Sequence, residues 1–358
     1  MESKLKAEGK NFDFVDTIRC ISMMGIVWEH SRIYLGPKYN SFGSILVEAS
    51  SIQFFKFSTI AFFLIGGFLI NHKFQEYSAI QYLKNRFKST VKPWLFWMFI
   101  FITLTVLDRW IAYSKGSDGG LMVSNFFKYI TDYFVWVLFF SPYWFILNFL
   151  ICISILLIFK KQLYNYKLGI MLGLISLVYS VNLYFRWFET SHTSALFGFV
   201  FYLWVGVYLN KHYSLILGFL RKTPWVFWII MIVLSFTLAI SESLYLTNLG
   251  NEDAYNTLRI SNIFYSFVVF GALLKIGNIK GLSYLKPRET TFGIYLIHII
   301  IIERFLPLIF QPLKLDVMHY TVWQNLGLLI TRFLIAYFMS YFLTRLIIRT
   351  KMKWSIGR

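Results

Sequence analysis

Long apolar stretches recur from one end of the chain to the other, and this recurrence constrains the fold more than any other feature of the sequence. The 358 residues are 57% hydrophobic and 15% charged, whereas a typical soluble domain is about 25% charged. A helix crosses a bilayer with about 20 consecutive residues that are mostly apolar. We therefore expect an all-α polytopic membrane helical bundle that forms a single domain over residues 1–358. About ten spans are predicted, at residues 13–33, 50–71, 91–113, 142–160, 167–185, 194–210, 224–244, 259–277, 291–310 and 324–348.

The lysines and arginines lie mostly between the predicted spans, on one side of the bundle. If the N-terminus is cytoplasmic, the segments on its side hold most of these residues and the external loops hold few. Because cytoplasmic loops of membrane proteins are enriched in lysine and arginine, we expect both termini in the cytoplasm. The net charge of +18 follows from this pattern, so we expect no nucleic-acid partner.

The longest predicted external loop, 114–141, contains the aromatic stretch FFKYITDYFVWVLFF. We expect it to form either an amphipathic helix at the membrane surface or a re-entrant segment. No stretch is large enough for a separate soluble domain, and the chain ends shortly after its last predicted helix. We therefore expect no appended soluble domain.

The first predicted span carries charged side chains, which are costly inside a bilayer and usually functional. Arg19 and His30 are eleven residues apart, which on an α-helix puts them on one face and about 16 Å apart along the axis. Asp16 precedes Arg19 by one turn and is expected to pair with it. Imidazole titrates near neutral pH, so His30 is a candidate general base. Glu29 points about 100° away from His30, toward either a structural partner or a substrate.

Several motifs resemble those of one known family. Asp-x-x-Arg followed by ten residues and a histidine resembles the first-span motif of the membrane acyltransferase-3 family, whose members O-acylate cell-surface glycans and lipids. The family's serine in the second span is Gly66 here, so a role for that hydroxyl does not transfer. Five further stretches resemble family motifs in the same order and extend the resemblance over nearly the whole chain: FFLIGGFLI (62–70), YLKNRFKSTVKPWLFW (82–97), YWFILNFLI (143–151), FYLWVGVYLNK (201–211) and TFGIYLIH (291–298).

The resemblance implies an acyl-CoA donor, most commonly acetyl-CoA, that is bound from the cytoplasm. Arg86 stands in the motif position of the basic stretch, and Lys88 and Lys92 follow it; these cations would bind the phosphates of CoA. Arg19 would hold the pyrophosphate or the start of the pantetheine arm. The alternative for the lysines is that they only mark the cytoplasmic side.

The same resemblance gives roles to the residues at the other end of the arm. His30 would take the proton from an acceptor hydroxyl as it attacks the thioester carbonyl; a covalent acyl-histidine is the open alternative. Tyr295 and His298 share one face of the ninth predicted span and would contact the thiol arm or stabilise the developing oxyanion. The structural alternative is a hydrogen bond between them that joins two helices.

The remaining polar and aromatic residues offer contacts for an acceptor sugar. An interhelical hydrogen bond for Asn148 and a solvated loop at 186–192 are the structural alternatives. Lys56 and Arg332 lie near the outer ends of their predicted spans and are expected to extend to the interface. The six histidines include no pair at ligand spacing with a carboxylate partner, so we expect no metal. The candidate acceptor contacts are Glu29, Trp144, Asn148, Trp187 and Glu189.

These features predict a multi-pass enzyme of the bacterial inner or plasma membrane, in contact with lipid. It would move an acyl group, expected to be acetyl, from cytoplasmic acyl-CoA to a hydroxyl of an extracytoplasmic cell-envelope glycan or lipid-linked sugar. The alternative is a transporter that exports a glycan intermediate or another small solute without acyl transfer. Transporter spans are often interrupted at mid-depth by glycine or proline, and the prolines here avoid the middles of the predicted spans. The sequence leaves open the acceptor, the acyl group and whether a homodimer forms.

Overall fold

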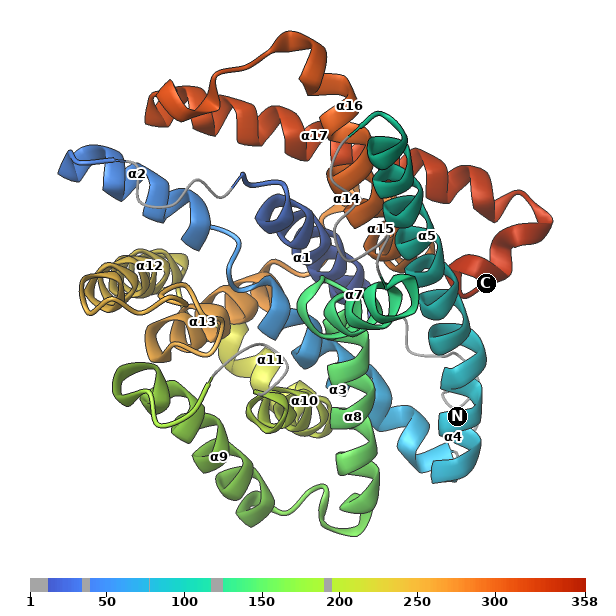
Figure 1. Cartoon of the computed structure of the whole chain (residues 1–358). Coiled ribbons are helices and arrows are strands. Elements are labelled where there is room, and N and C mark those ends of the chain that lie inside the picture. The colour runs from blue at the N-terminus through green and yellow to red at the C-terminus, as the bar shows by residue number, and fades with distance from the viewer. Residues whose placement is uncertain (1–11, 34–38, 77, 117–124, 190–194) are drawn as a thin grey trace.

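The computed structural model describes residues 12–33, 39–76, 78–116, 125–189 and 195–358, which form helices joined by turns, with no strand among them (Figure 1). The predicted all-α membrane bundle is therefore confirmed. The main helices are α1 (Asp13–His30), α2 (Phe42–Gln53), α3 (Ser58–Glu76), α4 (Ala79–Arg86), α5 (Lys92–Ser114), α7 (Phe126–Phe140), α8 (Trp144–Ile158), α9 (Tyr166–Phe185), α10 (Leu196–Lys211), α11 (Tyr213–Lys222), α12 (Trp225–Asn248), α13 (Ile260–Ile276), α15 (Pro287–Ile300) and α17 (Val322–Ile348). Shorter helical pieces are η2 (Phe87–Val91), η3 (Lys160–Gln162), α14 (Lys280–Ser283), η4 (Ile301–Phe305), α16 (Leu306–Phe310), η5 (Gln311–Leu313), η6 (Val317–His319) and η7 (Lys351–Ile356).

Each predicted span contains a helix, but the predicted number of membrane crossings is not confirmed. Among the described residues, 6 helical segments are long and apolar enough to cross a membrane, or up to 7 if the bent pair α7–α8 is one span. The apolar helices α10 and α13 have 16 and 17 residues, and α1 has 18 with charged side chains along it. These three are short or polar compared with the span of about 20 apolar residues that a bilayer needs.

Two bends interrupt stretches that are apolar in sequence. Residues 54–57 form a turn between α2 and α3, inside the segment predicted as one span at 50–71. The helix α7, which falls in the predicted external loop, meets α8 at an angle of 63°. The first bend is the more important for the site because it sets Lys56 inside the protein, with 6% of its surface exposed.

Two large clusters of buried side chains form most of the core, and α1 contributes to both. Ile18 in the first half of α1 packs into a cluster built from α3, α8, α10 and α13. Val27 in the second half packs into a cluster built from α5, α15 and α17. Helix α1 contacts both α3 and α15 and lies near the middle of the bundle (Figure 1). Its side chains therefore face the boundary between the two halves of the core.

The tightest helix pair is α3 with α10, where two glycines face each other. A Cβ atom at Gly67 would lie 2.9 Å from the backbone carbon of Leu203, and one at Gly206 would lie 2.9 Å from the backbone nitrogen of Phe68. Small residues let membrane helices approach at the backbone. Asn210 fastens the same pair, since its Nδ2 donates a hydrogen bond to the Phe68 carbonyl at 2.9 Å. This contact fixes α3, one wall of the candidate site.

Candidate active site

A cavity of about 420 Å³ lies along α1, lined by members of both core clusters. This volume falls within the range of about 300–1,000 Å³ that is usual for small-molecule sites. The walls come from α1, α3, α15 and the start of α8, and apolar side chains such as Met23, Ile65 and Phe149 form the middle. Arg19 and His30 both line the cavity, so it extends over their separation of about 16 Å along α1.

Arginines gather where Arg19 meets the cavity. Arg86, Arg288 and Arg358 line the cavity together with Arg19. The carboxylate of Asp16 accepts hydrogen bonds from Nε of Arg288 at 2.8 and 2.9 Å, and it lies 3.8 Å from Nη1 of Arg19. The expected pairing of Asp16 with Arg19 is thus present, but Asp16 makes its shorter contact with Arg288.

His30 lies at the other end, facing a second histidine. The ring centroids of His30 and His298 are 5.5 Å apart. His298 is fully buried, and its Nδ1 lies 2.6 Å from the backbone carbonyl oxygen of Tyr295. Because a carbonyl only accepts, Nδ1 must carry the hydrogen. Nε2 of His298 is then an acceptor, and it has no hydrogen-bond partner among the described residues.

The tyrosine next to this pair joins two elements. The hydroxyl of Tyr295 donates to the carbonyl oxygen of Pro142 at 2.5 Å, which ties α15 to the turn before α8. The hydroxyl of Tyr143 donates in the opposite direction, to the carbonyl of Leu296 at 2.8 Å. Tyr295 lines the cavity, whereas His298 lies behind its wall. The side chains of Tyr295 and His298 therefore do not hydrogen-bond to each other. The structural alternative, a hydrogen bond between these two side chains, is wrong.

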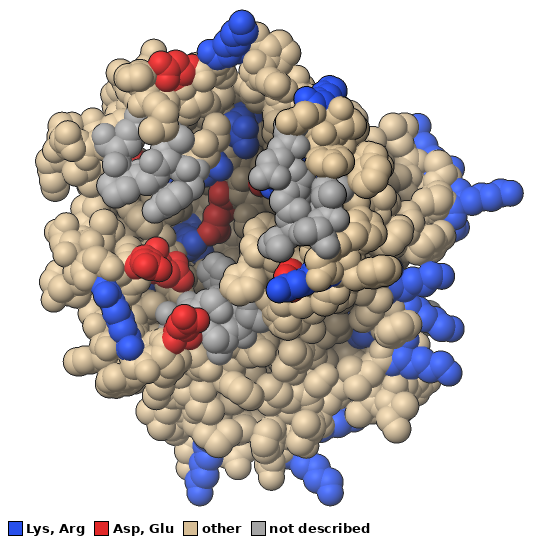
Figure 2. All heavy atoms as spheres, viewed as in Figure 1, with Lys and Arg blue, Asp and Glu red and all other residues tan. Residues whose placement is uncertain are grey.

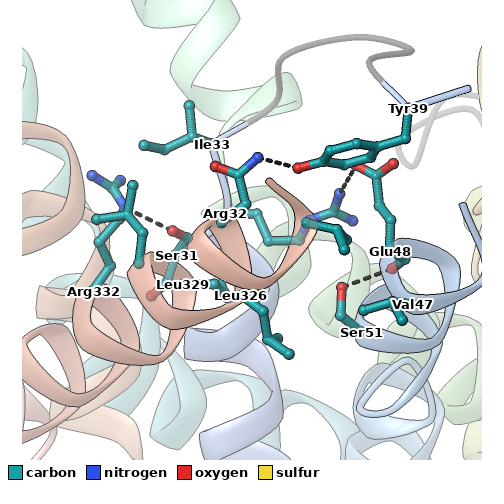
Figure 3. Close-up of a pocket in the computed structure, with 13 residues that line it drawn as sticks. Ser31, Arg32, Ile33, Tyr39, Val47, Glu48, Ser51, Leu326, Leu329 and Arg332 are labelled. Carbon is teal, nitrogen blue, oxygen red and sulfur yellow. Dashed lines mark hydrogen bonds and ion pairs between the residues drawn. The ribbon is translucent and has the colours of Figure 1, made fainter. Parts of the chain in front are cut away.

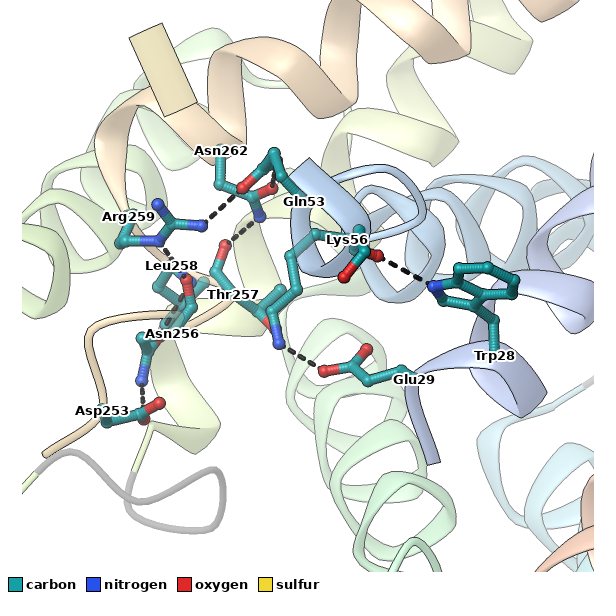
Figure 4. Close-up of polar contacts among 11 residues, drawn as sticks. Trp28, Glu29, Gln53, Lys56, Asp253, Asn256, Thr257, Leu258, Arg259 and Asn262 are labelled. Atoms are coloured by element: carbon teal, nitrogen blue, oxygen red, sulfur yellow. Dashed lines mark hydrogen bonds and ion pairs between the residues drawn. The ribbon is translucent and has the colours of Figure 1, made fainter. Parts of the chain in front are cut away.

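Glu29 lines the cavity next to His30 and forms an ion pair with Lys56 (Figure 4). Lys56 comes from the turn between α2 and α3 and is buried. The expectation that Lys56 extends to the membrane interface is therefore wrong. A buried lysine needs a partner charge to offset its desolvation, and Glu29 supplies it.

A buried arginine holds this turn in position. Arg259 is fully buried, and its Nη2 donates to Oε1 of Gln53, the last residue of α2, at 2.6 Å. The Nη1 atom donates to the carbonyl of Ala239 at 2.6 Å. Gln53 extends this hydrogen-bond network to Asn262, because its Nε2 donates to Oδ1 of Asn262 at 2.9 Å (Figure 4). Charge-assisted hydrogen bonds of this kind fix the turn, and with it the Lys56–Glu29 pair.

A second, smaller pocket of about 50 Å³ lies beyond the C-terminal end of α1, between α2 and α17 (Figure 3). Arg32 contacts Glu48 there at 3.5 Å, and Nε of Arg332 donates to the carbonyl of Ser31 at 2.8 Å. Tyr39 accepts a hydrogen bond from Asn325. One face of the molecule is hollowed, with Lys, Arg, Asp and Glu atoms at the rim and inside (Figure 2). The second pocket, between α2 and α17, is too small to hold a substrate by itself.

Two of the four basic residues predicted for the donor lie away from the cavity. Arg86 lines it, but Lys88 and Lys92 are exposed and do not. The Nζ atom of Lys92 lies 4.6 Å from the ring centroid of Trp354. The helical turn η2 follows Arg86 directly and contains Lys88. Ser89 and Thr90 of this turn line the cavity, whereas the Lys88 side chain is exposed.

Of the residues predicted to contact the acceptor, some line the cavity and others do not. Trp144 and Glu29 line the cavity. Asn148 is buried outside it, and its Oδ1 accepts a hydrogen bond from Sγ of Cys152 at 3.1 Å. Trp187 and Glu189 are exposed residues that do not line it.

Sequence reasoning missed two arginines. Arg288 is the second residue of α15, and Arg358 lies two residues after η7. Each is far from Arg19 along the chain, and neither belongs to a recognised motif. Their only sequence signal is that both lie in predicted cytoplasmic segments. Within the described residues no group of three or more histidine, cysteine, aspartate or glutamate side chains is arranged to hold a metal ion.

Comparison with known proteins agrees with the resemblance of the motifs. Two relatives from Staphylococcus aureus, strains MSSA476 and MRSA252, each bear the name "Probable poly-beta-1,6-N-acetyl-D-glucosamine export protein". Each is 22% identical to this chain over 308 residues, which are 80% of this chain and 81% of the relative. No solved structure matches the chain. The model of the acyltransferase-3 family, described as an acyltransferase domain, matches residues 12–349. Because this match covers nearly the whole chain and bears out the resemblance of the motifs, the chain belongs to the acyltransferase-3 family of membrane acyltransferases.

Proposed function

We propose that this membrane acyltransferase moves an acyl group, acetyl in the simplest case, from cytoplasmic acyl-CoA to a hydroxyl of an extracytoplasmic glycan or lipid-linked sugar. The observation that carries the proposal is a single cavity with arginines at one end and His30 at the other. Acyl transfer across a membrane needs both an anion-binding end and a proton-accepting end on one continuous path.

The arginine end is suited to the donor. CoA carries several phosphate charges, and guanidinium groups bind phosphate oxygens through paired hydrogen bonds. Arg86 donates through Nε to the hydroxyl of Tyr82 at 2.7 Å, and its guanidinium carbon lies 5.2 Å from the Tyr82 ring centroid. These contacts orient Arg86 and leave its terminal nitrogens for a ligand. The apolar middle of the cavity suits the pantetheine arm, whose thioester end would reach His30.

The chemical step requires one base at the His30 end of the cavity. A nitrogen of His30 takes the proton from the acceptor hydroxyl as the hydroxyl oxygen bonds to the thioester carbonyl carbon. The carbon–sulfur bond then breaks, the proton passes from His30 to the departing sulfur, and an ester and free CoA thiol result. In the covalent variant the acyl group rests on His30 between two such steps.

His298 fits a positioning role behind His30. Its Nδ1–H is committed to the Tyr295 carbonyl, so Nε2 presents a lone pair in the buried space beside the His30 ring. A lone pair there favours the form of His30 whose hydrogen points toward His298 and whose other nitrogen points at the substrate. Tyr295, which lines the cavity, is positioned by its bond to Pro142.

The acceptor would approach the His30 end. Trp144 offers an apolar ring for a sugar face, and the Glu29–Lys56 pair offers hydrogen-bonding groups beside His30. The name of the Staphylococcus relatives refers to a polymer of N-acetylglucosamine, which supports a glycan acceptor. It also supports the alternative in which the chain exports a glycan without transferring an acyl group.

An assay of thioester turnover separates these two functions. Purified protein in liposomes is given acetyl-CoA with radiolabelled acetyl, plus an N-acetylglucosamine oligosaccharide on the opposite side. We expect release of CoA thiol, with the label on the oligosaccharide or, if water is the acceptor, in free acetate. Oligosaccharide transport with intact acetyl-CoA would instead establish export.

Replacing Arg86 by alanine is expected to weaken acyl-CoA binding about 10-fold or more, because a hydrogen bond to a charged group contributes about 1.5–3 kcal/mol. Protein yield is expected to stay near that of the wild type, since the described contacts of this side chain are with Tyr82. Titration of CoA into the purified variant measures the affinity. Lys84→Ala, an exposed lysine of the same helix, is the matched control. Equal affinities in all three proteins would remove Arg86 from the donor site.

A further inference from the structure

The Arg19 end of the cavity contains more positive than negative charge. Four guanidinium groups line it, whereas the side-chain carboxylates there are Asp16, behind the wall, and Glu289, on the lining. Arg86 and Arg288 are near enough to Arg19 for their charges to oppose its own. Like charges held together are unfavourable unless an anion neutralises them. This end of the cavity is therefore matched to a ligand with more than one negative charge.

Arg358 has no carboxylate partner among the described residues. Its Nη2 donates to the backbone carbonyl of Arg288 at 2.7 Å, a contact that holds the two arginines side by side. Arg288 in turn is oriented by two hydrogen bonds to Asp16. Nη1 of Arg358 has no described contact, so this side chain can accept a second partner while it keeps the first.

The segment that carries Arg358 is held firmly against the bundle. Nε1 of Trp97 donates to the carbonyl of Ser355 at 2.8 Å, and Ser355 and Ile356 are buried. Trp354 packs edge-on against Phe96 with ring centroids 5.0 Å apart. The C-terminus accordingly lies beside α5 (Figure 1).

Gly357 makes this path possible. Its φ is +76°, a conformation that residues with a Cβ atom rarely adopt. A Cβ at this position would also lie 2.5 Å from the carbonyl oxygen of Ser89. Gly357 therefore lets the chain turn close to η2 and brings Arg358 to the cavity wall, where both residues are part of the lining.

We propose that Arg288 and Arg358 complete a phosphate-binding site at the Arg19 end of the cavity, with residues 356–358 as one of its walls. This inference rests on the proposed function, because it assigns the two arginines to the phosphate groups of the acyl-CoA donor. The same chemistry would suit the phosphate of a lipid headgroup. We favour the donor because the arginines line the cavity that leads to His30.

The test compares three donors with successively fewer phosphate groups: acetyl-CoA, 3′-dephospho-acetyl-CoA and S-acetyl-pantetheine, which also lacks the adenosine. For Arg358→Ala we expect the KM of acetyl-CoA to rise about 10-fold, with kcat within about twofold and the KM of S-acetyl-pantetheine unchanged. Arg288→Gln is expected to act in the same direction. Lys351→Ala, an exposed residue of the same segment that does not line the cavity, is expected to leave all three KM values unchanged.

Equal changes of KM for all three donors, or no change for any, would overturn the assignment. Binding of CoA itself, measured by calorimetry on the purified proteins, keeps the question separate from turnover. If wild-type protein binds CoA and Arg358→Ala binds it about 10-fold more weakly, the site stands even if no acyl transfer is seen. Unchanged CoA affinity, together with an activity of the wild type that depends on anionic lipid and is lost in Arg358→Ala, would assign the site to a headgroup instead.

Discussion

Replacing His30 by alanine is expected to lower acyl transfer by about 10²- to 10⁴-fold, the range that a positioned general acid–base contributes. The imidazole is the proton-accepting group that we assign to the reaction, and it lines the cavity at the end away from the arginines. Donor binding is expected to be unchanged, because the arginines line the other end of the cavity, where Arg19 is about 16 Å from His30 along α1. Transfer of radiolabelled acetyl from acetyl-CoA measures the rate, and CoA titration measures the affinity.

Two further variants test whether the loss of activity comes from the loss of the His30 imidazole itself. His30→Gln keeps a polar side chain of similar length and is expected to be as inactive as His30→Ala, which separates the loss of a base from the loss of packing. His319→Ala removes an exposed histidine that contacts Asp316 and is expected to keep full activity. Activity of His30→Gln near that of the wild type would show that the proton goes elsewhere.

Replacing Gly206 by leucine is expected to prevent the bundle from folding. Any side chain at this position would meet the carbonyl of Leu64 and the backbone nitrogen of Phe68. Because those atoms belong to the backbone of α3, they move only if the two helices separate. Overpacking in a core typically costs 1–3 kcal/mol when side chains can adjust, and here the helix itself must shift, so we expect a cost of at least ~3 kcal/mol.

Size-exclusion chromatography and thermal unfolding in detergent check this expectation. Gly206→Leu should give aggregate in place of a single peak, and Gly206→Ala should give a folded protein with a lower Tm. The matched control is Gly327→Leu in α17, where a Cβ atom would meet nothing within 4 Å. A Gly206→Leu protein as stable as this control would mean that α3 and α10 are not packed as described.

Hydropathy was sufficient to predict helices in the ten predicted spans, because each span is a long apolar segment. It did not predict the turn at 54–57, since its residues Phe54, Phe55 and Phe57 are as apolar as the helices on either side. No glycine or proline marks the change of direction. The turn is set by tertiary contacts, chiefly the hydrogen bond from Arg259 to Gln53. The burial of Lys56 follows from this turn and was unpredictable for the same reason.

The sequence predicted some of the residues that line the cavity and not others. The motif resemblance pointed to Arg86, Trp144 and Tyr295, which line it. Arg19 and His30 come eleven residues apart on α1, so helical geometry alone placed them on one face. Arg288 and Arg358 reach the same cavity from α15 and from the C-terminal segment. Which distant segment returns to which cavity depends on packing and on the conformation of single residues such as Gly357, and hydrophobic periodicity carries no such information.

Helix α1 has neither a proline nor a break between Arg19 and His30. The distance between these two side chains along the helix is therefore fixed. A donor anchored by its phosphates would present its carbonyl carbon at the same depth whatever the number of carbons in the acyl chain. Discrimination between short and long acyl groups would then fall on the side chains beyond His30, where the Glu29–Lys56 pair and Thr257 stand. A change of acyl preference among related enzymes should therefore arise from substitutions around the Glu29–Lys56 pair and Thr257, while the spacing of Arg19 and His30 on α1 stays the same.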